Sequence, residues 1–123
     1  MPICCLDVQD LKGRKIVFHE KHRKRKANTH SELNDLRPNG FVKNKIPIAL
    51  VDPDSIYRDL TNSKVRNYYK VESYTDTRWS RVYVYTKVVV ATMWSPWVII
   101  SAYRSPNIKE EWGDYKKCLY QKP

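Results

Sequence analysis

Three β-prone runs in the C-terminal half of the chain constrain its fold most strongly. They cover residues 68–74, 81–90 and 97–103, and each is rich in β-branched and aromatic residues. Short polar or proline-containing turns separate them. This spacing predicts a three-stranded antiparallel meander. Alternation along the last strand divides its residues into two faces: Val98, Ile100 and Ala102 on one, and Ile99, Ser101 and Tyr103 on the other.

The N-terminal half predicts one strand and short helices. A strand is expected at 15–19, after the turn signal of Gly13. Thr29 followed by Glu32 has the form of a capping box, which predicts a short helix through residue 36. Pro47 demotes the apolar stretch 41–51 to an edge strand or a loop.

Two further helices are expected from capping signals. The segment Asp52-Pro53-Asp54-Ser55 offers an N-cap and a first-turn proline, which predicts a helix through residue 60. Asn107 can cap a terminal helix that has Lys116 and Lys117 near its end. Together these elements predict an α+β fold of one domain, residues 1–123, in which short N-terminal helices pack on a C-terminal antiparallel sheet.

Composition indicates a folded protein of a reducing compartment. Hydrophobic residues make up 41% of the 123 residues, which suits a packed core and argues against disorder. No apolar run is long enough to span a bilayer, and the N-terminus lacks the pattern of a secretory signal. The three cysteines are an odd number, with Cys4 and Cys5 adjacent and no Cys-x-x-Cys spacing. We therefore expect a cytoplasmic protein without a disulfide framework, a metal, a cofactor or a membrane partner.

The charge of the chain points to a polyanionic partner. The formal net charge is +10 and the sequence pI is about 9.6. Eight basic residues lie between Lys12 and Lys26, against the single acid Glu20. A domain pI above about 9 is typical of nucleic-acid binders, because cations that neutralise phosphates release bound counterions.

The three histidines, His19, His22 and His30, lie inside or just after this basic stretch. A ribonuclease without a metal needs a base for the ribose 2′-hydroxyl, an acid for the leaving 5′-oxygen and cations for the charge on phosphorus. A predicted helix N-terminus at His30 favours neutral imidazole, which can act as a base. The alternative is that the histidines are ordinary solvated residues.

Other candidates lie on the predicted strands and in the basic run. Ser101 and Tyr103 share a strand face, where hydroxyls could bind phosphate, although an ordinary polar strand face has the same pattern. The run Arg23, Lys24, Arg25 and Lys26 is expected to bind phosphate, unless it is only a solvated loop. Tyr83 and Tyr85 share a strand face and are expected to stack on bases.

The order of these motifs resembles the phage-associated barnase, EndoU, colicin-tRNase and RelE-like nuclease superfamily. The similarity covers roughly residues 14–105, from the strand at 15–19 to the strand at 98–103. It implies metal-independent RNA cleavage by a toxin or effector, with His22 and His30 at the family's histidine positions and Ser101 at its polar position on the last strand. His19 and Tyr103 are their neighbours by inference. The chain differs from the family in its extra basic run and in lacking a clear acidic base.

The leading hypothesis from the sequence is a hydrolytic endoribonuclease that acts on RNA, with tRNA among the candidate substrates. One alternative is a nucleic-acid-binding module without catalytic activity. Another is a basic protein that docks on an acidic inhibitor or antitoxin.

Overall fold

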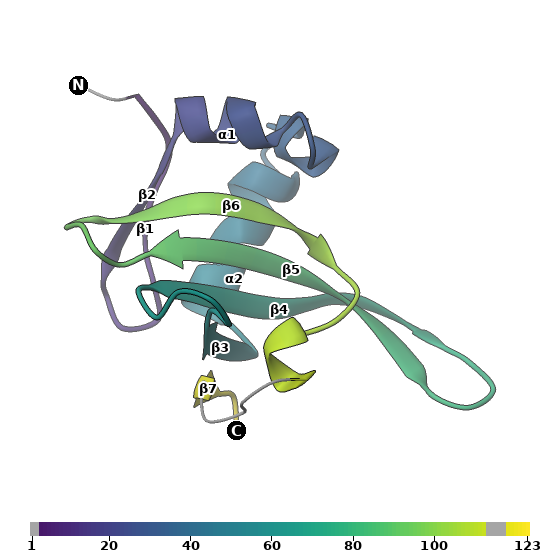
Figure 1. Ribbon diagram of the computed structural model, residues 1–123. Coiled ribbons are helices and arrows are strands. Elements are labelled where there is room, and N and C mark those ends of the chain that lie inside the picture. Colours follow the sequence, from purple (N-terminus) through teal and green to yellow (C-terminus); the bar gives the residue numbers. More distant parts are fainter. Residues whose placement is uncertain (1–2, 113–117) are drawn as a thin grey trace.

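The computed structural model describes residues 3–112 and 118–123, and its main element is a seven-stranded sheet (Figure 1). The strand order is β1-β2-β6-β5-β4-β3-β7. Neighbouring strands are antiparallel except β2 and β6, which are parallel. The strands are β1 Cys4–Gln9, β2 Lys15–His19, β3 Ser55–Arg58, β4 Val65–Asp76, β5 Arg81–Ala91, β6 Trp97–Ser105 and β7 Cys118–Gln121.

The expected fold class, N-terminal helices packed on a C-terminal sheet, is wrong. The protein is mostly sheet, and strands from both ends of the chain enter it. The two α-helices lie between β2 and β3. The helical segments are α1 Glu20–Lys26, α2 Ile46–Val51, the 3₁₀ turns η1 Ser31–Asn34 and η3 Lys109–Trp112, and the π-turn η2 Phe41–Lys45.

The stretch 41–51 is helical, contrary to the expected edge strand or loop. Phe41, Val42, Ile46, Ala49 and Leu50 are all fully buried, so the segment fills the core with one face of a helix. Pro47 lies in the first turn of α2, where a backbone N–H has no partner within the helix and its loss costs little.

The helix expected after residue 52 is replaced by a strand. β3 pairs with β4 on one side and with β7 on the other, so its backbone is satisfied from both edges. Ile56 and Tyr57 are β-prone and buried there, and tertiary pairing overrides the capping signal. At the C-terminus only η3 forms near the expected terminal helix, while Lys116 and Lys117 lie outside the described residues.

The predicted helix at 29–36 is reduced to one 3₁₀ turn. The Thr29 hydroxyl donates to the carbonyl oxygen of Lys26, at 3.2 Å, and so binds the preceding helix and does not cap a following one. Instead, the basic residues of the run 20–26 form α1, directly after the predicted strand β2.

The three C-terminal β-prone runs form β4, β5 and β6, paired antiparallel in that order. A register shift opposite Val89 and Val90 interrupts β6. Ile99 consequently joins Ala102 in the core, so the expected alternation is wrong at that position. Ser101 and Tyr103 keep a common face, opposite Val89 and Lys87.

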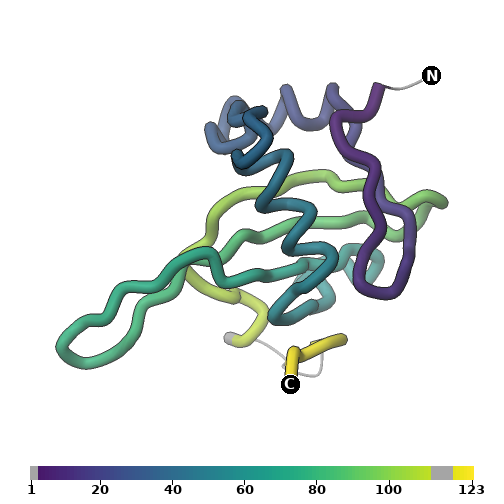
Figure 2. Tube along the Cα trace, turned by 180° about the vertical axis from the view of Figure 1, so that it is seen from behind, coloured from purple at the N-terminus to yellow at the C-terminus, as the bar shows by residue number. Residues whose placement is uncertain are grey.

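The two faces of the sheet have different coverings. Figure 2 shows α2 lying across one face, where its apolar residues meet those of the strands in the main core. On the opposite face, η3 is anchored by buried side chains. The Tyr69 hydroxyl donates to Glu110 Oε2 at 2.5 Å, the Asn67 amide donates to Glu110 Oε1, and the Tyr57 hydroxyl donates to Glu111 at 3.0 Å. We call this second side the open face, because neither α1 nor α2 lies across it.

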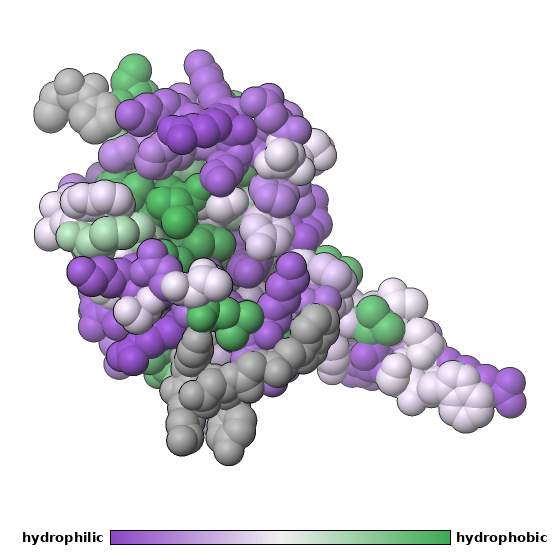
Figure 3. Space-filling model, in the orientation of Figure 1, coloured by the Kyte–Doolittle hydropathy of each residue, from purple (hydrophilic) through white to green (hydrophobic). Residues whose placement is uncertain are grey.

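The far ends of β4 and β5 extend beyond the sheet as a hairpin (Figures 1 and 3). Its tip carries Trp79, whose side chain is 85% exposed. No helix in the described ranges is long and apolar enough to cross a membrane. All three cysteines are free thiols.

Candidate active site

The register of the three central strands places a lysine between two tyrosines on the open face. Lys87 of β5 lies directly opposite Tyr69 of β4 and Tyr103 of β6. Its Nζ is 5.5 Å from the Tyr69 ring centroid and 5.4 Å from that of Tyr103. Both distances are within the range of cation–π attraction. The strand pairing therefore builds a fixed positive charge into the sheet surface.

Lys87 is unusual for a lysine on a strand, because the residue as a whole is almost completely covered. The residue is only 7% exposed, and it belongs to none of the ion pairs between the described residues. Its field still reaches Asp59: burial raises the pKa of that carboxyl, but hydrogen bonds from Asn67 and Thr61 together with the charge of Lys87 lower it overall. A cation of this kind favours the approach of a negative group.

His30 completes a cluster with Tyr103 and Lys87. The His30 ring stacks on the Tyr103 ring, with centroids 4.2 Å apart and planes inclined by 11°. β2 pairs with β6 only at Trp97 and Val98, so the rest of that edge of β6 is free for the segment that carries His30. Residues 30, 87 and 103, which are distant in sequence, meet here, and we call them the His–Lys–Tyr cluster.

Two hydrogen bonds hold the His30 segment against its neighbours. Arg23 Nη1 of α1 donates to the carbonyl oxygen of Leu33 at 2.8 Å, and both groups are buried. Glu32 Oε2 accepts from the backbone N–H of Arg104 in β6, at 3.0 Å. Arg23 also pairs with Glu20 through Nε, so its guanidinium is held by two partners within the protein. The structure thus places Arg23 among the buried structural residues, unlike the neighbouring cations.

A shallow cavity joins α1 to β6 beside this cluster. It has a volume of about 200 Å³ and is lined by His22, Arg25, Lys26 and Ile100. Ile100 precedes Tyr103 by three residues, so the cavity lies roughly 10 Å along β6 from the cluster. Lys24 is exposed on the same helix. The basic run therefore contributes Arg25 and Lys26 to a concave surface.

His22 is electrostatically distinct within this cavity. Burial lowers its pKa below the ordinary 6.5, and the nearby charges of Arg25, His19 and Lys21 act in the same direction, against a backbone contact with Ile99. The ring of His19 lies 5.6 Å away. His22 is therefore neutral near pH 7 and presents an uncharged imidazole among cations.

Comparison of the chain with protein-family models, curated proteins and solved structures finds no match.

A row of tyrosines connects the hairpin to the cluster. Ring centroids are 6.2 Å apart between Tyr74 and Tyr83, 6.0 Å between Tyr83 and Tyr85, and 6.0 Å between Tyr85 and Tyr69. Tyr69 then contacts Lys87. Tyr74 is exposed and Tyr83 and Tyr85 are half-buried, whereas Tyr69 is fully covered. The accessible part of the row offers ring faces for stacking.

The remaining sequence candidate, Ser101, lies on the open face but is 8% exposed and opposite Val89. Lys87 was not among the sequence candidates. The sequence signal that points to Lys87 is the two-residue period of a strand, which places Lys87 on the same face of the run 81–90 as Tyr83 and Tyr85. Among the described residues, no group of three or more His, Cys, Asp or Glu side chains is arranged to hold a metal ion.

Proposed function

We propose that the protein is a metal-independent endoribonuclease whose reaction takes place at the His–Lys–Tyr cluster. The observation that carries this proposal is the stacking of His30 on Tyr103, beside the ammonium group of the buried residue Lys87. A proton acceptor, a hydroxyl and a fixed cation are the groups that RNA cleavage by its own 2′-hydroxyl requires.

The proposed reaction is an internal transfer at phosphorus. The His30 imidazole takes the proton of the 2′-hydroxyl, and the 2′-oxygen forms a bond to phosphorus. The bond from phosphorus to the 5′-oxygen breaks, and that oxygen takes a proton from the Tyr103 hydroxyl. Lys87 stabilises the negative charge that develops on the phosphoryl oxygens. The products carry a 2′,3′-cyclic phosphate and a 5′-hydroxyl.

The surroundings of the cluster suit an RNA strand. Arg25 and Lys26 line the cavity beside α1 and can neutralise phosphates on one side of the reacting bond. Tyr83 and Tyr85 lead away toward the hairpin and offer stacking surfaces on the other side. Free thiols and a formal net charge of +10 fit a cytoplasmic enzyme acting on RNA, with tRNA among the candidate substrates.

The experiment compares cleavage of a mixed-sequence RNA by the wild-type protein with cleavage by His30→Ala and Lys87→Met. We expect each substitution to lower the rate by about 10²-fold or more, because one removes the base and the other the stabilising charge. Lys64→Gln is the matched control, since Lys64 is an exposed cation that directly precedes β4.

Each variant is first tested for folding by thermal unfolding. Full activity of a folded His30→Ala protein contradicts the mechanism. RNA that stays intact but shifts with the wild-type protein on a native gel favours a binding module, and inhibition by a co-purifying acidic protein favours a toxin with its inhibitor.

A further inference from the structure

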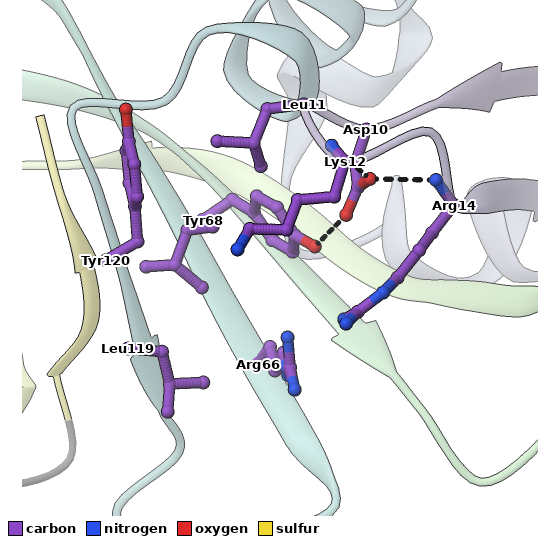
Figure 4. Close-up of a pocket in the computed structure, with 9 residues that line it drawn as sticks. Asp10, Leu11, Lys12, Arg14, Arg66, Tyr68, Leu119 and Tyr120 are labelled. Atoms are coloured by element: carbon purple, nitrogen blue, oxygen red, sulfur yellow. Dashed lines mark hydrogen bonds between the residues drawn. The ribbon is translucent and has the colours of Figure 1, made fainter.

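A second group of cations surrounds a pocket on the α2 side of the sheet. The pocket has a volume of about 200 Å³, and Figure 4 shows its charged and aromatic side chains converging on a common space. Lys12 and Arg14 come from the turn between β1 and β2, Arg66 comes from β4, and Tyr120 comes from β7. The basic run of the sequence is thus divided between two sites, with Lys12 and Arg14 here and Arg25 and Lys26 beside α1.

The turn that carries Lys12 and Arg14 is fixed by a buried carboxylate. Asp10 is 6% exposed, and its Oδ1 accepts the backbone N–H groups of Lys12 and Arg14 at 2.9 and 3.0 Å. Its Oδ2 accepts the Tyr68 hydroxyl at 2.9 Å (Figure 4). Gly13 has a φ of +79°, a conformation that favours glycine. These contacts hold the two basic side chains at the pocket rim before any ligand arrives.

Two guanidinium groups lie against the same indole ring. The Cζ atoms of Arg14 and Arg66 are 4.6 and 4.8 Å from the Trp97 ring centroid. A guanidinium over an indole ring is attracted to the ring face, and its N–H groups that do not meet the ring remain available as donors. Planar N–H pairs of this kind are the donors that bind phosphate oxygens in a bidentate manner.

The three cations of the pocket, Lys12, Arg14 and Arg66, form no ion pairs within the part of the chain that the structure describes. Asp10, the carboxylate of the lining, is engaged by the turn backbone and Tyr68. Burial lowers the pKa of Arg66, and repulsion from Arg14 and Arg58 lowers it further, against the attraction of Asp10 and Tyr68. The cations therefore repel one another, and a bound anion would relieve that repulsion.

We propose that this pocket binds the phosphate group of a nucleotide, with the two arginine side chains as its donors and Lys12 as a third cation. The half-buried side chains of Leu119 and Tyr120 line the same pocket and offer an apolar wall to the sugar or base. The nucleotide is either free or part of a strand.

This site is separate from the proposed cleavage site. Trp97 and Tyr103 are six residues apart on β6, which is roughly 20 Å along a strand. Tyr68 and Ile56, which line the pocket, belong to the core on the α2 side, whereas Lys87 and Tyr103 lie on the open face. The inference consequently goes beyond the proposed function and does not require it.

The test measures binding of three probes by isothermal titration: inorganic phosphate, adenosine 5′-monophosphate and a single-stranded DNA of about eight nucleotides. DNA lacks the 2′-hydroxyl, so it binds without being cleaved. We expect saturable binding of the mononucleotide, and the double variant Arg14→Gln/Arg66→Gln should weaken it by about ten-fold or more. If the DNA binds more tightly than the mononucleotide and the double variant abolishes that binding, the ligand is a phosphate within a strand. If the DNA and the mononucleotide bind with equal affinity, the ligand is a free nucleotide.

The matched control is Arg78→Gln. Arg78 also places a guanidinium over an indole, that of Trp79, at 5.0 Å, but on the exposed hairpin. The affinity of the Arg78→Gln protein for the mononucleotide should differ from that of the wild type by less than about two-fold. Arg14→Gln alone keeps the test valid if the double variant unfolds, since Arg14 is exposed. No saturable binding of any probe, unchanged affinity in the folded Arg14 variant, or equal losses in the Arg78 variant would each overturn the proposal.

Discussion

Several ionisable residues of this protein are partly or fully buried. His22, Lys87 and Glu110 are the main examples, and each is held by an environment that a strand or helix pattern does not reveal. The protonation of His22 and the hydrogen bonds of Glu110 therefore link stability to these buried surroundings.

His22 should make the protein less stable in mild acid. Its pKa in the folded state lies below the ordinary 6.5, because burial disfavours the charged imidazole. The unfolded chain therefore binds the proton more readily than the folded protein. As a result, the free energy of unfolding falls when the pH drops below 6.5 toward the folded-state pKa, whereas above pH 6.5 this group has no effect on stability. We expect His22→Gln to lose less stability than the wild type between about pH 7.5 and about pH 5.5, measured by urea unfolding. An identical pH dependence in both proteins would refute this assignment.

The hydroxyl of Tyr69 should matter for stability more than those of exposed tyrosines. It donates to the buried carboxylate of Glu110, and Tyr69→Phe would leave that oxygen without this donor in the interior. We expect a loss of about 1–3 kcal/mol in the free energy of unfolding. The control is Tyr74→Phe, since Tyr74 is 54% exposed and should change stability by less than about 0.5 kcal/mol. Equal effects of the two substitutions would argue against the anchoring of η3 by Tyr69.

At the scale of elements, strands were easier to predict from the sequence than the helices. The runs that form β4, β5 and β6 combine strong β propensity with short turns, so local signals and tertiary pairing agree. Residues 46–51, in contrast, are all apolar, half of them β-branched, and include a proline, so it is their packing against the sheet that makes them helical. β3 depends on its two partner strands, one of which is the short β7 near the C-terminus.

The candidate site was also predictable only in part, because it depends on how the strands pair. His30 and Tyr103 were each suspected from the sequence, but their contact depends on β2 leaving most of the edge of β6 free. The sequence does not indicate Lys87 as a site residue, because a lysine on a strand ordinarily reaches solvent. Its burial follows from the tyrosines on both neighbouring strands and from η3 on the same face.

The link between α1 and η1 should affect both stability and cleavage. Arg23→Met removes the hydrogen bond to the carbonyl oxygen of Leu33 and the pair with Glu20, while it keeps much of the apolar stem. We expect the free energy of unfolding to fall by about 1–3 kcal/mol, measured by urea unfolding. Cleavage should slow mainly in kcat, because His30 is less firmly positioned while Arg25 and Lys26 still bind RNA. A folded variant with unchanged kcat would show that Arg23 does not position His30.

At the scale of the whole molecule, one sheet presents two basic surfaces on opposite sides. The open face combines Lys87 with His30 and Tyr103, and the α2 side combines Lys12, Arg14 and Arg66 around one pocket. The net charge of +10 supplies attraction to any polyanion over both surfaces. What separates an enzyme from a merely basic protein is whether the open face performs chemistry.

The most direct test incubates the purified protein with RNA in EDTA and identifies the 3′ ends of the fragments. The account predicts fragments that end in 2′,3′-cyclic phosphate and begin with a 5′-hydroxyl, because the 2′-oxygen is the nucleophile and no metal is needed. RNA that remains intact, or fragments that carry a 5′-phosphate and a 3′-hydroxyl, would contradict the proposed reaction.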